Sequence, residues 1–145
     1  MELRICIDVD DMERAIAFYT AGLGLRLGRR FNSDFVEILG ASSPIDLLFN
    51  AAGTRPIAGS PGARNYRRHW TPVHLDFIVE DIAAAVARLQ AHGAILEMPV
   101  TEHAWGRIPG LADPFGHGLD LLEFRGRGYD AILPPDLAPL SLQNK

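Results

Sequence analysis

The sequence has one cysteine among its 145 residues, and it lacks both a long hydrophobic run and an excess of positive charge. The single Cys6 excludes a disulfide within the chain and a zinc cluster built from several cysteines of one chain. No segment approaches the roughly 20 apolar residues of a membrane-spanning helix, and the first residues contain no signal-peptide core. We therefore expect a cytoplasmic protein with no membrane partner.

The charge balance argues against a nucleic-acid partner. The formal net charge is −4 and the isoelectric point is near 5.7, whereas binding to phosphate groups needs a positive surface. One basic cluster, formed by Arg64, Arg67, Arg68 and His69, lies in a segment rich in glycine, proline and serine. We expect this segment to be a solvated loop.

An internal repeat organises the chain. Residues 73–80 alternate between apolar and polar side chains, which predicts a strand, and Asp81 follows where a helix N-cap is expected. Apolar residues then recur with helical spacing, at Ile82, Ala85, Val86 and Leu89. Positions 79, 81, 82, 85, 86 and 89 match positions 9, 11, 12, 15, 16 and 19 at a constant offset of seventy residues. Agreement of strand end, cap and apolar stripe at one offset predicts a duplicated module.

Each half is predicted to run strand, helix, strand, strand, strand. The first half has expected strands at residues 3–9, 25–31, 34–39 and 45–50, and a helix at 11–21. The second half has expected strands at residues 73–80, 94–98, 107–112 and 118–124, and a helix at 81–91. We predict a first module at residues 1–50, a linker or flap at 51–72, a second module at 73–124 and a C-terminal tail at 125–145.

Three stretches of the repeat carry a family resemblance: VDDMERAIAFYTAGLGL in the first half, and VHLDFIVEDI and GLADPFGHGLDLLEF in the second. They resemble the vicinal-oxygen-chelate superfamily, which includes glyoxalase, extradiol dioxygenase and bleomycin-resistance proteins. The resemblance implies an α+β fold of two βαβββ modules, in which the sheets form a curved half-barrel with helices outside and a ligand cleft inside. This scaffold hosts several chemistries, so the resemblance indicates the fold and not the reaction.

The resemblance also implies a set of metal ligands. In metal-using members a ligand lies on the first and last strand of each module, and these positions fall on His74, Asp46 and Asp120. The fourth falls on Arg4, which cannot be a ligand because its guanidinium stays protonated. One imidazole and two carboxylates suit Zn, Ni, Mn, Fe or Co. The alternative is a metal-free cleft, in which Arg4 pairs with Asp46 or Asp120 and His74 forms hydrogen bonds.

Polar side chains are expected to point into this cleft from both modules. Their burial in a dry core would cost free energy, which favours a wet ligand cleft. Asp46 and Asp120 are the candidate catalytic carboxylates, because a carboxylate can serve as a general base. The candidate ligand-binding residues are Arg4, Asn50, Asp76 and Trp105. Trp105 is alternatively a packing residue, and we expect His117 to be a surface residue.

We predict a glyoxalase-like small-molecule enzyme of the lyase, isomerase or dioxygenase type, with a divalent metal if His74, Asp46 and Asp120 hold one. The alternative is a metal-free protein, similar to bleomycin-resistance proteins, that sequesters an antibiotic or metabolite in the same cleft. The missing fourth ligand favours the alternative, and the three remaining ligand-type residues favour the enzyme. We also expect a homodimer, because open sheet edges need to be covered.

Overall fold

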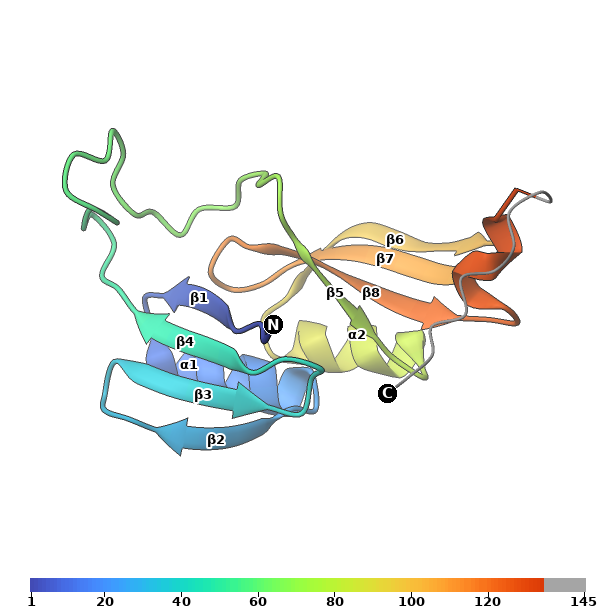
Figure 1. The fold of residues 1–145 in the computed structure, drawn as a ribbon, viewed down its shortest axis with the longest axis horizontal. Helices are drawn as coiled ribbons and strands as arrows, with labels where there is room; N and C mark the ends of the chain where they lie inside the picture. Colours follow the sequence, from blue (N-terminus) through green and yellow to red (C-terminus); the bar gives the residue numbers. More distant parts are fainter. Residues whose placement is uncertain (135–145) are drawn as a thin grey trace.

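The computed structural model describes residues 1–134 as two consecutive modules (Figure 1). The first module consists of β1 (Ile5–Val9), α1 (Met12–Ala17), the π-helical turn η1 (Phe18–Gly22), β2 (Arg26–Arg30), β3 (Phe35–Leu39) and β4 (Ile45–Phe49). The second consists of β5 (Leu75–Ile78), α2 (Ile82–Ala91), β6 (Ile95–His103), β7 (Gly106–Ala112) and β8 (Gly118–Phe124). A short 3-10 helix, η2 (Gly128–Ile132), follows. Most of the predicted tail, from residue 135 onward, lies outside the described residues.

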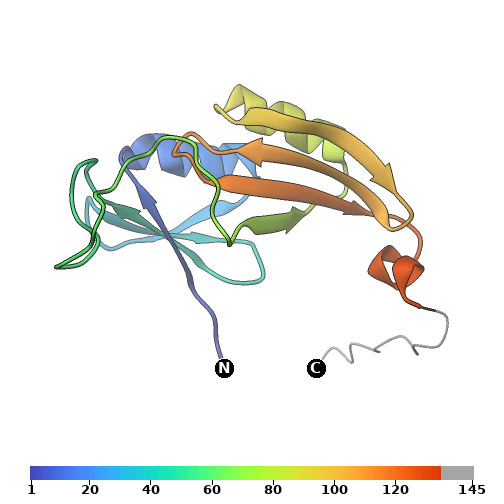
Figure 2. The same cartoon turned by 90° about the horizontal axis from the view of Figure 1, so that it is seen from above.

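The two modules repeat the same sheet topology. One sheet has the strand order β1-β4-β3-β2 and the other has β5-β8-β7-β6. In each, the first strand of the module pairs in parallel with the last, and the remaining pairs are antiparallel. The helices α1 and α2 lie on the same side of the molecule (Figure 2). The predicted α+β class of two βαβββ modules is therefore confirmed.

The predicted helix caps form in both modules. The side chain of Asp11 accepts a hydrogen bond from the backbone N–H of Arg14, and the side chain of Asp81 accepts one from Ala84, each at 3.0 Å. These bonds satisfy backbone donors that the first helical turn leaves unpaired. The repeated apolar stripe is buried, with Ala15 and Leu89 fully enclosed. Side chains from both modules pack into one hydrophobic core.

Strand β6 is longer than the sequence predicted. The expected strand at residues 94–98 continues as far as His103, because the backbone keeps pairing with β7 through two register shifts. Pro99 lies within the second shift, between Met98 and Thr101, and has no N–H to donate, a situation that is tolerated at sheet edges and bulges. None of the helices in residues 1–134 has the length and apolar composition to cross a bilayer.

The connection between the modules is tied to both of them. Residues 50–74 contain no helix or strand, yet Arg64 donates to Asp8 at 2.6 Å and its side chain is only 16% exposed. Arg68 donates through Nε and Nη2 to Glu97 on β6, at 2.7 and 2.8 Å. The segment is a loop, as expected, and Arg68 is exposed, but Arg64 departs from the expectation of a solvated side chain because it is mostly buried against Asp8 on β1.

Candidate functional site

An arginine network covers the polar face of the first sheet. Arg4, just before β1, donates from Nε and Nη2 to the two carboxylate oxygens of Asp46, at 2.8 and 2.6 Å. The same Nη2 donates to Glu37 at 2.9 Å, and Arg29 donates twice to Glu37, at 2.9 and 2.6 Å. Asp46 and Glu37 are 4% and 3% exposed, so two nearly buried carboxylates are balanced by two guanidinium groups.

This network holds the carboxylate of Glu37 in the ionised form. Hydrogen bonds from Arg29 and then Arg4 lower the pKa of Glu37 to about 2, against the opposing effect of burial. Bonds to Asp46 and Glu37 raise the pKa of Arg4 above its usual value. Glu37 was not among the residues that the sequence pointed to. It faces the polar side because it pairs with Asp46 in the antiparallel register of β3 and β4.

A second polar cluster lies on the sheet of the second module. The Nε2 atom of His74 is 3.2 Å from Asp76 on β5 and 3.6 Å from Asp120 on β8. Each of the three residues offers a ligand atom, and these atoms lie within 4.8 Å of one another. Burial and the neighbouring charge of Asp76 raise the pKa of Asp120, while His74 acts in the opposite direction. The cluster therefore offers one imidazole and two carboxylates, and the pKa of one of these, Asp120, is raised.

The structure does not assemble the ligand set that combined both modules. Asp46 lies outside the group that His74 forms with Asp120, and in the described chain its two oxygens are engaged by Arg4. A metal there would have to displace a bidentate arginine contact, which is one of the stronger polar interactions in proteins. The two-module donor set therefore does not fit a metal in this chain.

The remaining predicted ligand-binding residues have partners of their own. Asn50 donates to Asp8 at 2.9 Å, and its backbone carbonyl accepts a bond from the Tyr66 hydroxyl at 2.6 Å. Trp105 packs among aromatic rings: it stacks on His103 with ring centres 5.1 Å apart, and contacts Tyr129 at the same distance. These contacts favour the packing interpretation of Trp105.

A pocket of about 360 Å³ lies between the two modules. Its apolar wall is formed by Ile5, Ile7, Val73, Leu75, Phe77 and Leu119. Polar side chains enter it from both modules, among them Cys6, Asp8, Tyr19, His74 and His117. A second pocket of about 300 Å³ shares His74 with the first and extends to Asp120 and Trp70. His74 thus stands where the two pockets meet.

The Asp-Pro-Phe-Gly turn at residues 113–116 places His117 in the pocket between the two modules. The Nδ1 atom of His117 is 2.8 Å from Oδ2 of Asp113, whose side chain is fully buried. Tyr19, from the first module, donates its hydroxyl to the same oxygen at 3.1 Å. His117 is therefore not the simple surface residue that the sequence suggested. The sequence spacing of Asp113 and His117 was visible, but nothing in it indicated that Tyr19 would enclose the pair.

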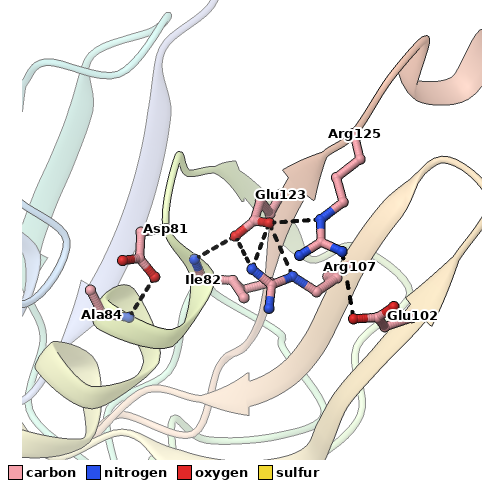
Figure 3. A network of polar contacts seen from close by, with 7 residues as sticks. All are labelled: Asp81, Ile82, Ala84, Glu102, Arg107, Glu123 and Arg125. Carbon is pink, nitrogen blue, oxygen red and sulfur yellow. Dashed lines mark hydrogen bonds and ion pairs between the residues drawn. The ribbon is translucent and has the colours of Figure 1, made fainter.

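A third polar network, away from these pockets, fixes the start of α2 (Figure 3). Glu123 accepts a hydrogen bond from the backbone N–H of Ile82 at 2.9 Å, and Arg107 donates to both of its carboxylate oxygens. Hydrogen bonds from Arg107, then Ile82 and Arg125, lower the pKa of Glu123 to about 2. The network joins β7, β8 and the N-terminus of α2, so its role is to position these elements.

Two βαβββ modules with a polar cluster on each sheet are the architecture of the vicinal-oxygen-chelate superfamily. The model of the glyoxalase-like domain family matches residues 4–122. The chain belongs to this family. No curated protein matches the sequence with significance.

Solved structures share the fold at low sequence identity. A glyoxalase-related enzyme from Fulvimarina pelagi is 20% identical, with a TM-score of 0.67 over 85% of this chain and 87% of that chain. The fosfomycin resistance protein of Listeria monocytogenes is 17% identical, with a TM-score of 0.64 over 86% and 93%. An antibiotic binding protein from Streptomyces sp. CB03234 is 20% identical, with a TM-score of 0.58 over 86% and 96%. The neighbours therefore include both enzymes and binding proteins on one scaffold.

Proposed function

We propose that this protein binds a small, mostly apolar organic molecule in the pocket between its modules, and that it does so without a metal. The observation that carries the proposal is the bidentate contact of Arg4 with Asp46. This contact occupies both carboxylate oxygens of Asp46, which are then not available to a metal, and the guanidinium neutralises their charge. Of the two functions that the sequence left open, this favours the metal-free binding protein.

The pocket itself supports this choice. Its volume of about 360 Å³ is in the range of ligand sites in proteins, and apolar side chains form most of its wall. A few polar groups, including His74 and His117, lie at separate points of the lining. Such a combination suits a ring-containing molecule that is held by apolar contacts and oriented by one or two hydrogen bonds.

A second candidate function is a metal-dependent enzyme that uses the second module alone. The specific observation in its favour is the cluster of His74, Asp76 and Asp120, whose ligand atoms lie within 4.8 Å of one another. One imidazole and two carboxylates form a donor set that suits first-row divalent metals. Water would have to complete the coordination from the open side of the sheet, since His74 and Asp76 are exposed.

Metal binding separates the two candidates. In calorimetric titrations with zinc, nickel and manganese, we expect the wild-type protein to give no more heat than His74→Asn, which lacks the imidazole donor. Protein purified without a chelator is expected to contain metal well below one equivalent. Stoichiometric binding by the wild type that disappears in His74→Asn would favour the metal-dependent enzyme instead.

The pocket is tested on the same preparations with the fluorescent apolar probe 8-anilinonaphthalene-1-sulfonate. Cys6 is exposed and lines the pocket, so Cys6→Trp fills the space without disturbing the core. We expect one probe site in the wild type and in the matched control Cys6→Ser, and at least about tenfold weaker binding in Cys6→Trp, because apolar contact area drives such binding. Equal binding by all three proteins would show that the probe lies elsewhere and would count against the pocket.

We further propose that the chain forms a homodimer. The edge strand β6 exposes apolar side chains, with Ile95 at 62% and Met98 at 54% exposure, and edge strands carry unpaired backbone groups that favour association. Sedimentation velocity at micromolar concentration is expected to give the mass of two chains. A single monomeric species over that concentration range would contradict this proposal.

A further inference from the structure

The carboxylate of Asp113 receives four hydrogen bonds. Its Oδ1 atom accepts from the backbone N–H groups of Phe115 and His117, each at 2.8 Å. Its Oδ2 atom accepts from the Tyr19 hydroxyl at 3.1 Å and lies 2.8 Å from Nδ1 of His117. An ionised carboxylate has only acceptor sites, so each of these four partners must be a donor.

Tyr19 cannot act as the acceptor in its hydrogen bond with Asp113. Burial, followed by the charge of Asp113, raises the pKa of Tyr19 well above its usual value, so the phenol keeps its proton and donates it. The contact at Nδ1 of His117 is then also a donation to Asp113. We assign the neutral imidazole as the Nδ1–H form, which leaves the lone pair on Nε2.

This lone pair is available to a ligand. Every buried side-chain nitrogen and oxygen in residues 1–134 has a hydrogen-bond partner. Nε2 of His117 has no partner among these residues, so it is not one of the buried atoms. The Nε2 atom is therefore accessible, in agreement with a side chain that is 34% exposed and lines the pocket. A buried carboxylate that fixes one ring nitrogen leaves the other nitrogen oriented for recognition or proton transfer.

The other polar side chains of the pocket lack this arrangement. Both oxygens of Asp8 are bonded, one to Asn50 and the other to Arg64. Nε2 of His74 is 3.2 Å from Asp76, whose side chain is 39% exposed and not buried, and the hydroxyl of Thr71 donates to the backbone carbonyl of Val73. His117 is therefore the histidine of this pocket that has one nitrogen fixed by a buried carboxylate and the other free to accept.

We infer that the pocket selects ligands that carry a hydroxyl group on an apolar ring, and that this hydroxyl donates a hydrogen bond to Nε2 of His117. Phenols and enols are the chemical class that meets both requirements. This inference rests on the proposed function, because it concerns the ligand of the same pocket. His117 would be the residue that distinguishes a hydroxylated ligand from its ether.

The test compares two probes with the same ring system, one with a hydrogen-bond donor and one without. 2-Naphthol presents an O–H group, whereas 2-methoxynaphthalene has the same rings and no donor. At neutral pH we expect the wild type to bind 2-naphthol about tenfold more tightly, as measured by displacement of the fluorescent probe, because one satisfied hydrogen bond is worth about that factor.

Two histidine variants provide the contrast. In His117→Asn the side-chain amide can replace Nδ1 as the donor to Asp113 while Nε2 is removed, so the preference should fall to about onefold and the ether should bind as before. His92→Asn is the matched control, because His92 lies at the end of α2 and does not line the pocket. It should keep the wild-type preference.

The inference is overturned if wild type binds both probes equally, or if His117→Asn retains the preference. If the wild type binds the two probes equally and Cys6→Trp abolishes the binding of both, the pocket and the proposed function stand although the inference fails. Failure of both probes to bind would end the inference, while loss of the fluorescent probe's own site would end the proposed function. Nitrogen-15 NMR of the imidazoles gives a readout that needs no variant: the Nε2 resonance of His117 should be that of an unprotonated nitrogen and should shift with 2-naphthol only.

Discussion

Replacing Gly106 with alanine is expected to lower the free energy of unfolding by on the order of 4 kcal/mol. Gly106 begins β7 with a φ of +149°, which L-residues rarely adopt. An added Cβ would lie 2.1 Å from the backbone carbonyl oxygen of Glu123, far inside van der Waals contact. Because the obstacle is backbone in the adjacent strand β8, it cannot rotate away, and the two strands would have to separate.

Gly24→Ala is the matched control for this prediction. Gly24 also has a positive φ, of +75°, but nothing lies within 4 Å of an added Cβ. It should cost only the conformational penalty of about 1–2 kcal/mol. Urea unfolding followed by circular dichroism measures both variants. Equal losses of unfolding free energy in the two variants would show that the close approach of the added Cβ to Glu123 does not contribute.

Replacing Tyr19 with phenylalanine is expected to cost about 2 kcal/mol. The ring and its edge-to-face contact with Phe18, at 5.2 Å, are retained, and only the hydroxyl is removed. The buried Oδ2 atom of Asp113 then loses one of its two donors, at a position where Tyr19 is only 2% exposed. The bond also connects the first module to the second, so its loss should weaken their association.

Tyr129→Phe serves as the comparison for that variant. Tyr129 lies in η2 and is 48% exposed, so solvent can replace its hydrogen bonds and the change should stay within about 0.5 kcal/mol. Thermal and urea unfolding of both variants give the two values. A Tyr19→Phe protein as stable as Tyr129→Phe would show that the bond to Asp113 contributes nothing net.

The repeat in the sequence was sufficient to predict the two modules, because cap and apolar stripe are local patterns. Asp11 and Asp81 cap their helices as expected, and the final strand ends at Phe124 as predicted. The length of β6 was not predictable, since Pro99 reads as a strand end and only pairing with β7 reveals that the strand continues.

The candidate site was predictable as a set of residues but not as contacts. Arg4 pairs with Asp46, as the metal-free alternative predicted, and Glu37 and Arg29 extend this pair. Glu37 and Arg29 lie on strands in which the alternation of apolar and polar residues is not clear in the sequence. The grouping of His74 with Asp76 and Asp120 depends on the parallel register of β5 and β8, which places Asp76 opposite Asp120. Long-range register of this kind has no signature in a single sequence.

The π-helical turn η1 accommodates a difference in length between the two copies of the module. From cap to terminating glycine the first module runs 14 residues, Asp11 to Gly24, whereas the second runs 13, from Asp81 to Gly93. A wide turn accommodates one additional residue without rotating the preceding helix, so Ala15 keeps the place that Ala85 has in the other copy. The two copies of the module therefore differ in length by one residue here, which is why one copy ends in a π-turn and the other in a regular α-helix.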